Sequence, residues 1–293
     1  MRRWFAIAKA TALEMISEPL SLLLLLTALS LVTLAPAMHY HQFGEPTRMA
    51  RDAGLSSLFL FAGVFAVTGV FRSLRREIES GTAQMAISHS VSRRVFFLAK
   101  FSGAMMAYAL FALITASVSF VMVYGAAVGG EIAGRSGDIA RLWGPALAAG
   151  SAVIVLPPVV AAGLNRFWRF RFVQSAFALT SVFSLVAAGW FFDWREALRL
   201  ASAWIPLAFP AAVFIAAAAA FAVAMRPNYA VLALSAVLTV SVPAIGNYYL
   251  ADSLSKGASV PWGYVALSAA AAMPAIAAFL VLGVFLFERR DIA

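Results

Sequence analysis

The chain has 293 residues, 63% of them apolar, with a mean hydropathy of +0.88 and a formal charge of +9. Because roughly half of the residues in soluble domains are apolar, this composition excludes an ordinary soluble protein. The basic residues are divided among short segments between apolar blocks, which excludes a nucleic-acid partner and favours membrane topology signals. The chain has no cysteine, which excludes disulfides and thiolate chemistry.

The first predicted element is an interfacial helix over residues 1–19. Residues 2–18 mix charged side chains with apolar and aromatic ones, a composition that suits a helix lying in the headgroup plane. Pro19 then opens the first membrane span, because the first N–H group of a helix has no intrahelical partner to lose.

Apolar blocks of near-spanning length follow along the chain, since roughly 20 apolar residues cross a bilayer as a helix. They cover residues 20–38, 54–71, 101–124, 142–164, 172–192, 204–224, 229–246 and 264–286. The sequence therefore predicts an all-α, polytopic transmembrane helical bundle of 6 to 8 spans, with eight favoured, forming a single domain over residues 1–293. Six spans would result if part of 204–246 entered and left the membrane from one side, because the break at Arg226-Pro227-Asn228 is very short.

The orientation follows from the distribution of basic residues. In the eight-span layout, 15 Lys and Arg residues fall on the side that holds both termini and 7 fall on the opposite side. Since cytoplasmic segments carry an excess of Lys and Arg, both termini are predicted to be cytoplasmic. No segment on the outer side is long enough for a folded domain of its own.

Ionisable residues are absent from the interiors of the predicted spans. All thirteen Asp and Glu residues and the three histidines fall outside the spans or at their ends. A stand-alone secondary carrier or channel usually needs a polar relay inside the membrane, so that hypothesis is disfavoured. No Gly-x-x-x-x-Gly-Lys-Ser/Thr loop is present to hold nucleotide phosphates, so the chain is predicted not to be an enzyme and to hold no cofactor of its own.

A lipid-modifying membrane enzyme is a further alternative. Its candidate catalysts would be carboxylates on the outer side, namely Glu131, Asp138, Asp193, Glu196 and Asp252. These carboxylates have no evident basic or metal-binding partner in the sequence. Weak candidates for a soft metal such as copper(I) are Met38, His39 and His41, although polar residues that cap a span at the interface are the ordinary explanation.

The most patterned polar stretch is residues 72–100, on the side of the termini. Arginines and carboxylates at its start are spaced three and four apart, so a helix would bring them within pairing distance. Gly81 offers a break, and Thr82 can cap a second short helix. Ser92 can cap the helix that leads into the next span. A solvated basic loop that only follows the positive-inside rule is the alternative.

The spacing in this stretch resembles the cytoplasmic signature of type-2 ABC-transporter permeases. The matching residues are Glu77, Glu79, Gly81, Thr82, Ser88, Val91, Ser92, Arg93 and Lys100. Ser90 stands where that family usually has proline and Ala99 where it often has glycine, but the spacing is intact. The amphipathic start of the chain resembles the elbow helix of the family, and the last residues, 287–293, resemble its cytoplasmic tail.

The resemblance implies a permease subunit of an ABC exporter in the bacterial cytoplasmic (inner) membrane. Such a permease forms the translocation path as a homo- or heterodimer and is driven by a separate P-loop ATPase, present in two copies, which binds ATP-Mg. A short coupling helix within 72–100 would seat in a cleft of the ATPase. The predicted coupling interface consists of Glu77, Glu79, Gly81, Thr82, Met85, Ile87, His89, Ser92 and Arg93.

Different roles are expected within this interface. Three residues, Met85, Ile87 and His89, are expected to contact the ATPase, with Arg93 as a polar anchor. The two carboxylates, Glu77 and Glu79, are expected to hold the segment in shape by pairing with nearby arginines. Nothing in the sequence identifies the transported substrate, because fold-level analogy does not select one.

Overall fold

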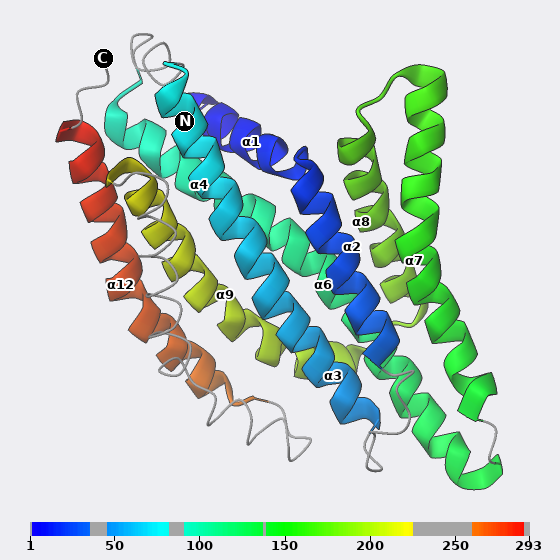
Figure 1. Cartoon of the computed structure of the whole chain (residues 1–293). Coiled ribbons are helices and arrows are strands. Elements are labelled where there is room, and N and C mark those ends of the chain that lie inside the picture. The colour runs from blue at the N-terminus through cyan, green and yellow to red at the C-terminus, as the bar shows by residue number, and fades with distance from the viewer. Residues whose placement is uncertain (1, 36–45, 82–90, 137–138, 225–259, 290–293) are drawn as a thin grey trace.

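The computed structural model describes residues 2–35, 46–81, 91–136, 139–224 and 260–289. Over these ranges every regular element is a helix, as expected where lipid offers no partner to backbone polar groups. The elements in chain order are α1 (Arg2–Ile16), α2 (Pro19–Leu34), α3 (Pro46–Ser57), the π-helical turn η3 (Leu58–Ala62), α4 (Gly63–Glu79), α6 (Arg93–Ser136), α7 (Ile139–Trp168), α8 (Phe172–Trp190), α9 (Trp194–Ala224) and α12 (Trp262–Arg289). α3, η3 and α4 form one continuous rod (Figure 1). The all-α prediction is confirmed.

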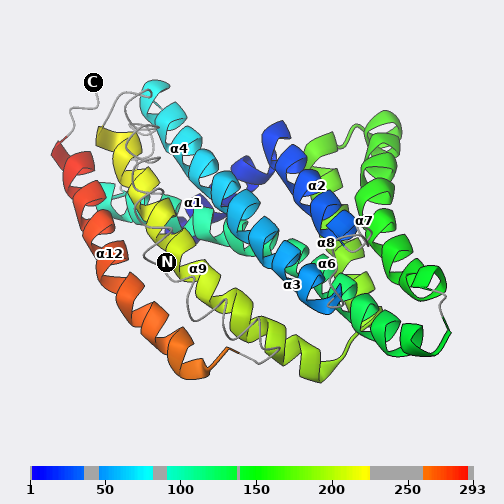
Figure 2. The same ribbon diagram turned by 60° about the horizontal axis from the view of Figure 1, so that its bottom comes forward.

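Six helices in the described part of the chain are long and apolar enough to cross a membrane, or seven if the bent pair α1–α2 is one span. The predicted apolar blocks coincide with these helices, except for 229–246, which lies outside the described residues. α9 and α12 run in the same direction in both views (Figures 1 and 2). The chain is a multi-pass membrane protein.

α1 and α2 meet at a sharp corner of 66°. Pro19 stands at the start of α2, as predicted. α1 lies across α6, and two glycines permit its close approach to the bundle. A Cβ atom on Gly103 of α6 would lie 2.4 Å from the carbonyl oxygen of Ala8, and one on Gly69 of α4 would lie 2.4 Å from Cε of Met15. The separate helix expected before the first span is therefore present and packs directly on two spanning helices.

The main apolar core surrounds α6 and takes buried side chains from α2, α4 and α9, with Phe177 from α8. Phe65 and Phe111 stack with ring centroids 5.0 Å apart, and Phe177 lies 6.5 Å from each of them. All three side chains are buried, and offset aromatic pairs of this kind add to the energy of burial. α6 and α9 are the most buried spanning helices, whereas α7, α8 and α12 are largely exposed on the outside of the bundle.

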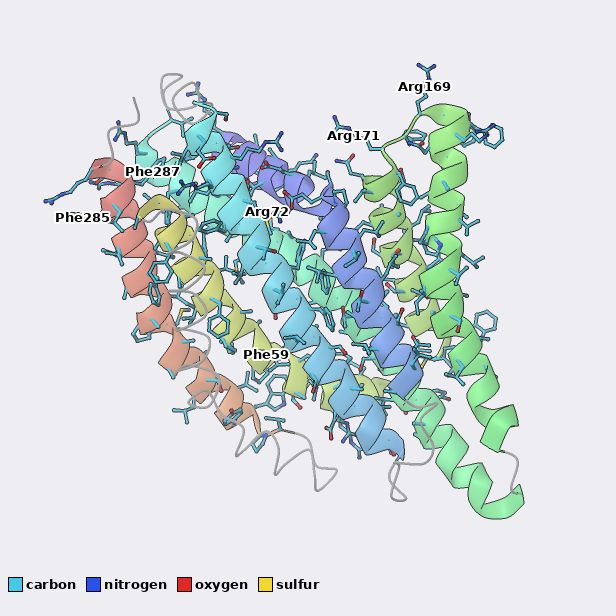
Figure 3. All side chains as sticks on the ribbon, viewed as in Figure 1. Phe59, Arg72, Arg169, Arg171, Phe285 and Phe287 are labelled. Atoms are coloured by element: carbon cyan, nitrogen blue, oxygen red, sulfur yellow. The ribbon has the colours of Figure 1, made fainter. Side chains whose placement is uncertain are left out.

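One end of the bundle gathers the basic segments. The N-terminus of α1, the end of α4, the start of α6, the turn between α7 and α8 and the end of α12 all lie there (Figure 1). Arg72, Arg169 and Arg171 are seen at the same end (Figure 3). We call this end the basic end of the bundle. It holds the described parts of the 72–100 segment.

Candidate functional site

The first half of the 72–100 segment continues α4 out of the bundle and ends at a glycine. Ser80 N–H donates to the carbonyl of Arg76 at 2.9 Å, and Gly81 follows with a φ of 70°. This left-handed conformation costs a residue with a Cβ atom about 1 kcal/mol or more, which is why helices commonly stop at glycine. The predicted break at Gly81 is thus observed. Arg75 Nε and Glu79 Oε1 form the expected pair one turn apart, at 2.6 Å.

The second half begins with a capped helix. The N–H group of Val95 donates to Oγ of Ser92 at 3.3 Å, and that of Phe96 donates to the Ser92 carbonyl at 3.0 Å. Ser92 therefore acts as the N-cap of α6, as its residue type and position predicted. Between these two helix ends, residues 82–90 lie outside the described residues. The predictions for Thr82, Met85, Ile87 and His89 fall in that range, and those for Met38, His39 and His41 fall in another such range, 36–45.

Directly behind these two ends lies a buried charged cluster that joins three helices. It consists of Glu14 from α1, Ser73 and Glu77 from α4, and Lys100 from α6, and we call it the Lys100 cluster. Lys100 Nζ lies 2.7 Å from Glu77 Oε1 and 3.6 Å from Glu14 Oε2, and it donates to Ser73 Oγ at 2.9 Å. The Ser73 hydroxyl in turn donates to Glu14 Oε2 at 2.6 Å.

Burial makes this cluster energetically important. The Lys100 side chain is only 3% exposed, while the side chains of Glu77 and Glu14 are 27% and 28% exposed. A buried ammonium group without a partner is strongly unfavourable, but the close ion pair with Glu77, the longer ion pair with Glu14 and the hydrogen bond to the Ser73 hydroxyl offset that desolvation. The lysine is therefore fixed by its partners, and with it the relative rotation of α1, α4 and α6.

A second junction ties the start of α6 to the end of α12. Arg93 Nη1 donates to the carbonyl of Glu288 at 2.9 Å, and Arg94 Nε lies 2.6 Å from Glu288 Oε1. The rings of Phe96 and Phe287 stack 5.7 Å apart. A cation that bonds the last carbonyls of a helix also interacts favourably with the helix dipole. The two sequence segments that carry the family resemblance, near 93–100 and 287–289, thus lie against each other.

Several of these partners were not foreseen from the sequence. Glu79 pairs with an arginine as predicted, but Glu77 contacts Lys100 across helices, and Arg93 contacts the end of α12. Glu14 and Ser73 were not recognised as site residues at all. A usable signal was present, because Ser73 and Glu77 are four apart and Lys100 is one of only three lysines, placed at the start of an apolar block. A lysine in that position marks a candidate site when a carboxylate can reach it.

No protein-family model, curated protein or solved structure matches this chain. What is established is a polytopic, all-helical membrane protein with a charged junction of three helices at its basic end.

Proposed function

We propose that the chain is the membrane-spanning permease subunit of an ABC exporter, which works as a dimer and is driven by a separate P-loop ATPase that binds ATP-Mg. The observation that carries the proposal is the construction of the basic end. The short segment 82–90 is held between a glycine-terminated α4 and a serine-capped α6. Both helices are joined behind that segment by the Lys100 cluster.

This construction suits the transmission of force. A push on residues 82–90 acts on α4 and α6 together, because the ion pair between Glu77 and Lys100 resists their separation. Glu14 couples the movement to α1, which lies across α6 at Gly103. The ATPase pair favours a closed arrangement when ATP is bound, so its closure would shift the population of a two-state arrangement of these helices.

The proposed orientation places the basic end in the cytoplasm of a bacterium. The end that holds the exposed Arg72, Arg169 and Arg171 also holds the described ends of the chain (Figure 3). Segments rich in Lys and Arg remain on the cytoplasmic side during insertion. A soluble ATPase would then have access to the end of α4 and the start of α6, which flank residues 82–90 in the sequence.

The proposal is tested by purification of the chain from its native membranes in mild detergent, with identification of the bound proteins by mass spectrometry. A P-loop ATPase should remain bound and hydrolyse ATP. Replacing residues 82–90 by a Gly-Ser linker of equal length should release the ATPase, because the side chains proposed to contact it would be removed. Gly81 would still end α4, and Ser92 would still cap the start of α6. The variant should still be inserted in the membrane.

The matched control is the same linker placed over residues 37–45, which connect α2 to α3 in the sequence. The end of α2 and the start of α3 lie at the opposite end of the bundle (Figure 1). That variant should keep the ATPase. Retention of the ATPase after the 82–90 replacement, or equal loss in both variants, would contradict the proposed coupling. A chain that carries no ATPase under several detergent conditions would contradict the permease assignment itself.

A secondary carrier is a second candidate, and one observation favours it. Lys100 is an ionisable side chain that is almost fully buried in a spanning helix, and such residues often mark ion pathways. The test is proton or sodium movement in proteoliposomes that contain the chain alone. Movement that disappears in Lys100→Met would favour the carrier over the ATP-driven permease.

A further inference from the structure

The turn between α7 and α8 alternates basic and aromatic residues. It reads Asn-Arg-Phe-Trp-Arg-Phe-Arg-Phe over residues 165–172, and we call it the Arg-aromatic turn. All its arginines, Arg166, Arg169 and Arg171, are exposed. Its aromatic residues are exposed as well, with Phe167 at 79% and Trp168 at 70%. Figure 3 shows Arg169 and Arg171 pointing away from the bundle at the basic end.

Internal hydrogen bonds hold the turn in a defined shape. Asn165 Nδ2 donates to the carbonyl of Phe170 at 2.6 Å, and the N–H group of Arg169 donates to the carbonyl of Asn165 at 3.1 Å. Arg169 has a φ of 56°, in the left-handed region that helix ends usually give to glycine or asparagine. A bulky charged residue thus occupies a position where glycine would be easier to accommodate. Unfavourable backbone of this kind is concentrated at functional sites.

The arginines of the turn form no ion pair within the described part of the chain. The sequence has no Asp or Glu between Asp138 and Asp193. The opposite end of α8 is different. There Asp193 and Glu196 accompany Arg195 and Arg199, and Arg199 pairs with Glu196 at 2.8 Å.

The depth of the turn is set by α8. This helix has 19 residues, which at about 1.5 Å per residue span about 28 Å, close to the roughly 30 Å of a hydrocarbon core. Exposed aromatic residues stand at both of its ends: Phe167, Trp168 and Phe170 at one, and Trp190, Phe192 and Trp194 at the other. Such aromatic belts mark the two membrane interfaces. The arginines of the turn therefore lie at the level of the lipid headgroups.

We propose that the Arg-aromatic turn binds the phosphate group of an anionic phospholipid in the leaflet at the basic end. The guanidinium groups of Arg169 and Arg171 supply forked donors that fit a phosphate, which an ammonium group does not. The exposed rings of Phe167 and Trp168 lie against the glycerol and upper acyl region of the same lipid. A protein surface is a poorer fit, because the aromatic rings stand at the level where headgroups and chains meet.

The test is native mass spectrometry of the purified chain in a neutral detergent at low salt, titrated with phosphatidylglycerol or with phosphatidylcholine of the same acyl chains. The wild-type chain should bind phosphatidylglycerol more tightly. The double variant Arg169→Gln/Arg171→Gln should weaken phosphatidylglycerol binding roughly 30-fold, since each basic residue near a membrane surface contributes about a factor of five. Arg169→Lys/Arg171→Lys should bind phosphatidylglycerol more weakly than wild type but more tightly than the Gln variant, because the charge remains and the forked donors are lost.

The matched control is Arg195→Gln/Arg199→Gln at the other end of α8, which should leave the affinity for phosphatidylglycerol unchanged. The proposal is overturned if the turn variant binds phosphatidylglycerol like wild type, if the control loses as much, or if both lipids bind equally well. It is also overturned if the turn variant keeps its lipid but loses a bound ATPase, because the turn would then be a protein contact. The lipid titration uses the chain alone, so its result is independent of the proposed transport function.

Discussion

Replacing Lys100 by Met removes the charge at the centre of the three-helix junction while keeping a side chain of similar length. The lysine is 3% exposed and contacts two carboxylates and a hydroxyl, so the substitution leaves Glu77 and Glu14 without their common cation. Breaking a buried ion pair on one side typically costs about 3–5 kcal/mol. Because both carboxylates are about one quarter exposed and can recover some hydration, we expect the lower limit, about 3 kcal/mol.

The assay is a double-mutant cycle on the free energy of unfolding, followed in mixed micelles with an increasing fraction of denaturing detergent. The cycle combines Lys100→Met and Glu77→Gln singly and together. Because the two side chains share a direct charged contact, the double variant should be less destabilised than the sum of the singles by about 1–2 kcal/mol. Glu79→Gln is the matched control, since Glu79 is 59% exposed and its ion pair in the described part of the chain lies along its own helix, with Arg75. It should cost less than about 0.5 kcal/mol.

Two results would refute this reasoning. An additive cycle would mean that Glu77 and Lys100 do not stabilise each other, whatever their separation in space. A cost for Glu79→Gln as large as that for Glu77→Gln would mean that net charge at the basic end, and not the buried contact, determines stability.

Three further substitutions test the packing and the helix ends. Gly103→Ala should displace α1 from α6, because the added Cβ would lie 2.4 Å from a backbone carbonyl of α1. The distance between spin labels on two introduced cysteines, one in α1 and one in α6, should therefore lengthen. Gly163→Ala is the control and should leave that distance unchanged, because nothing lies within 4 Å of its added Cβ. Gly81→Ala should cost about 1 kcal/mol of unfolding free energy because of its φ of 70°, and Gly81→Asn should cost less. Ser92→Ala should cost about 1 kcal/mol and speed hydrogen exchange in the first turn of α6; unchanged exchange would mean that the cap is not formed.

The spanning helices could be predicted from the sequence because the signal is mainly composition. A run of about 20 apolar residues has few options other than a helix in lipid, since every backbone polar group needs a partner there. The ends of the helices were predictable for a similar reason at Pro19, Gly81 and Ser92, where local chemistry dictates the backbone. The presence of a corner between α1 and α2 follows from the polar residues before Pro19. Its angle depends on how α1 packs against α6, which could not be predicted from the sequence.

The partners within the site were harder to predict, because they depend on distant contacts and on helix rotation. Glu14 and Lys100 are 86 residues apart in the sequence, and Arg94 and Glu288 are 194 apart. A periodic pattern shows which residues share a face of a helix but not which face of another helix they meet. The apolar faces gave little help, because lipid-facing and core-facing positions of a membrane helix use the same residues. The pairing of Glu79 with Arg75 was predictable because it lies within one helix.

The choice of an ionic cluster at this junction is informative, because apolar packing in the same place is often as stable or more so. α1 crosses α6 through small residues and presents apolar side chains on one face, and such a face alone permits several rotations. The shared contacts of Lys100 with Glu14, Ser73 and Glu77 define one rotation of all three helices. Because the carboxylates are partly open to water, the cluster can be rearranged at a smaller cost than a dry one. The proposed movement of α1, α4 and α6 by an ATPase would need such a junction, which specifies one arrangement firmly and still allows another within a few kcal/mol.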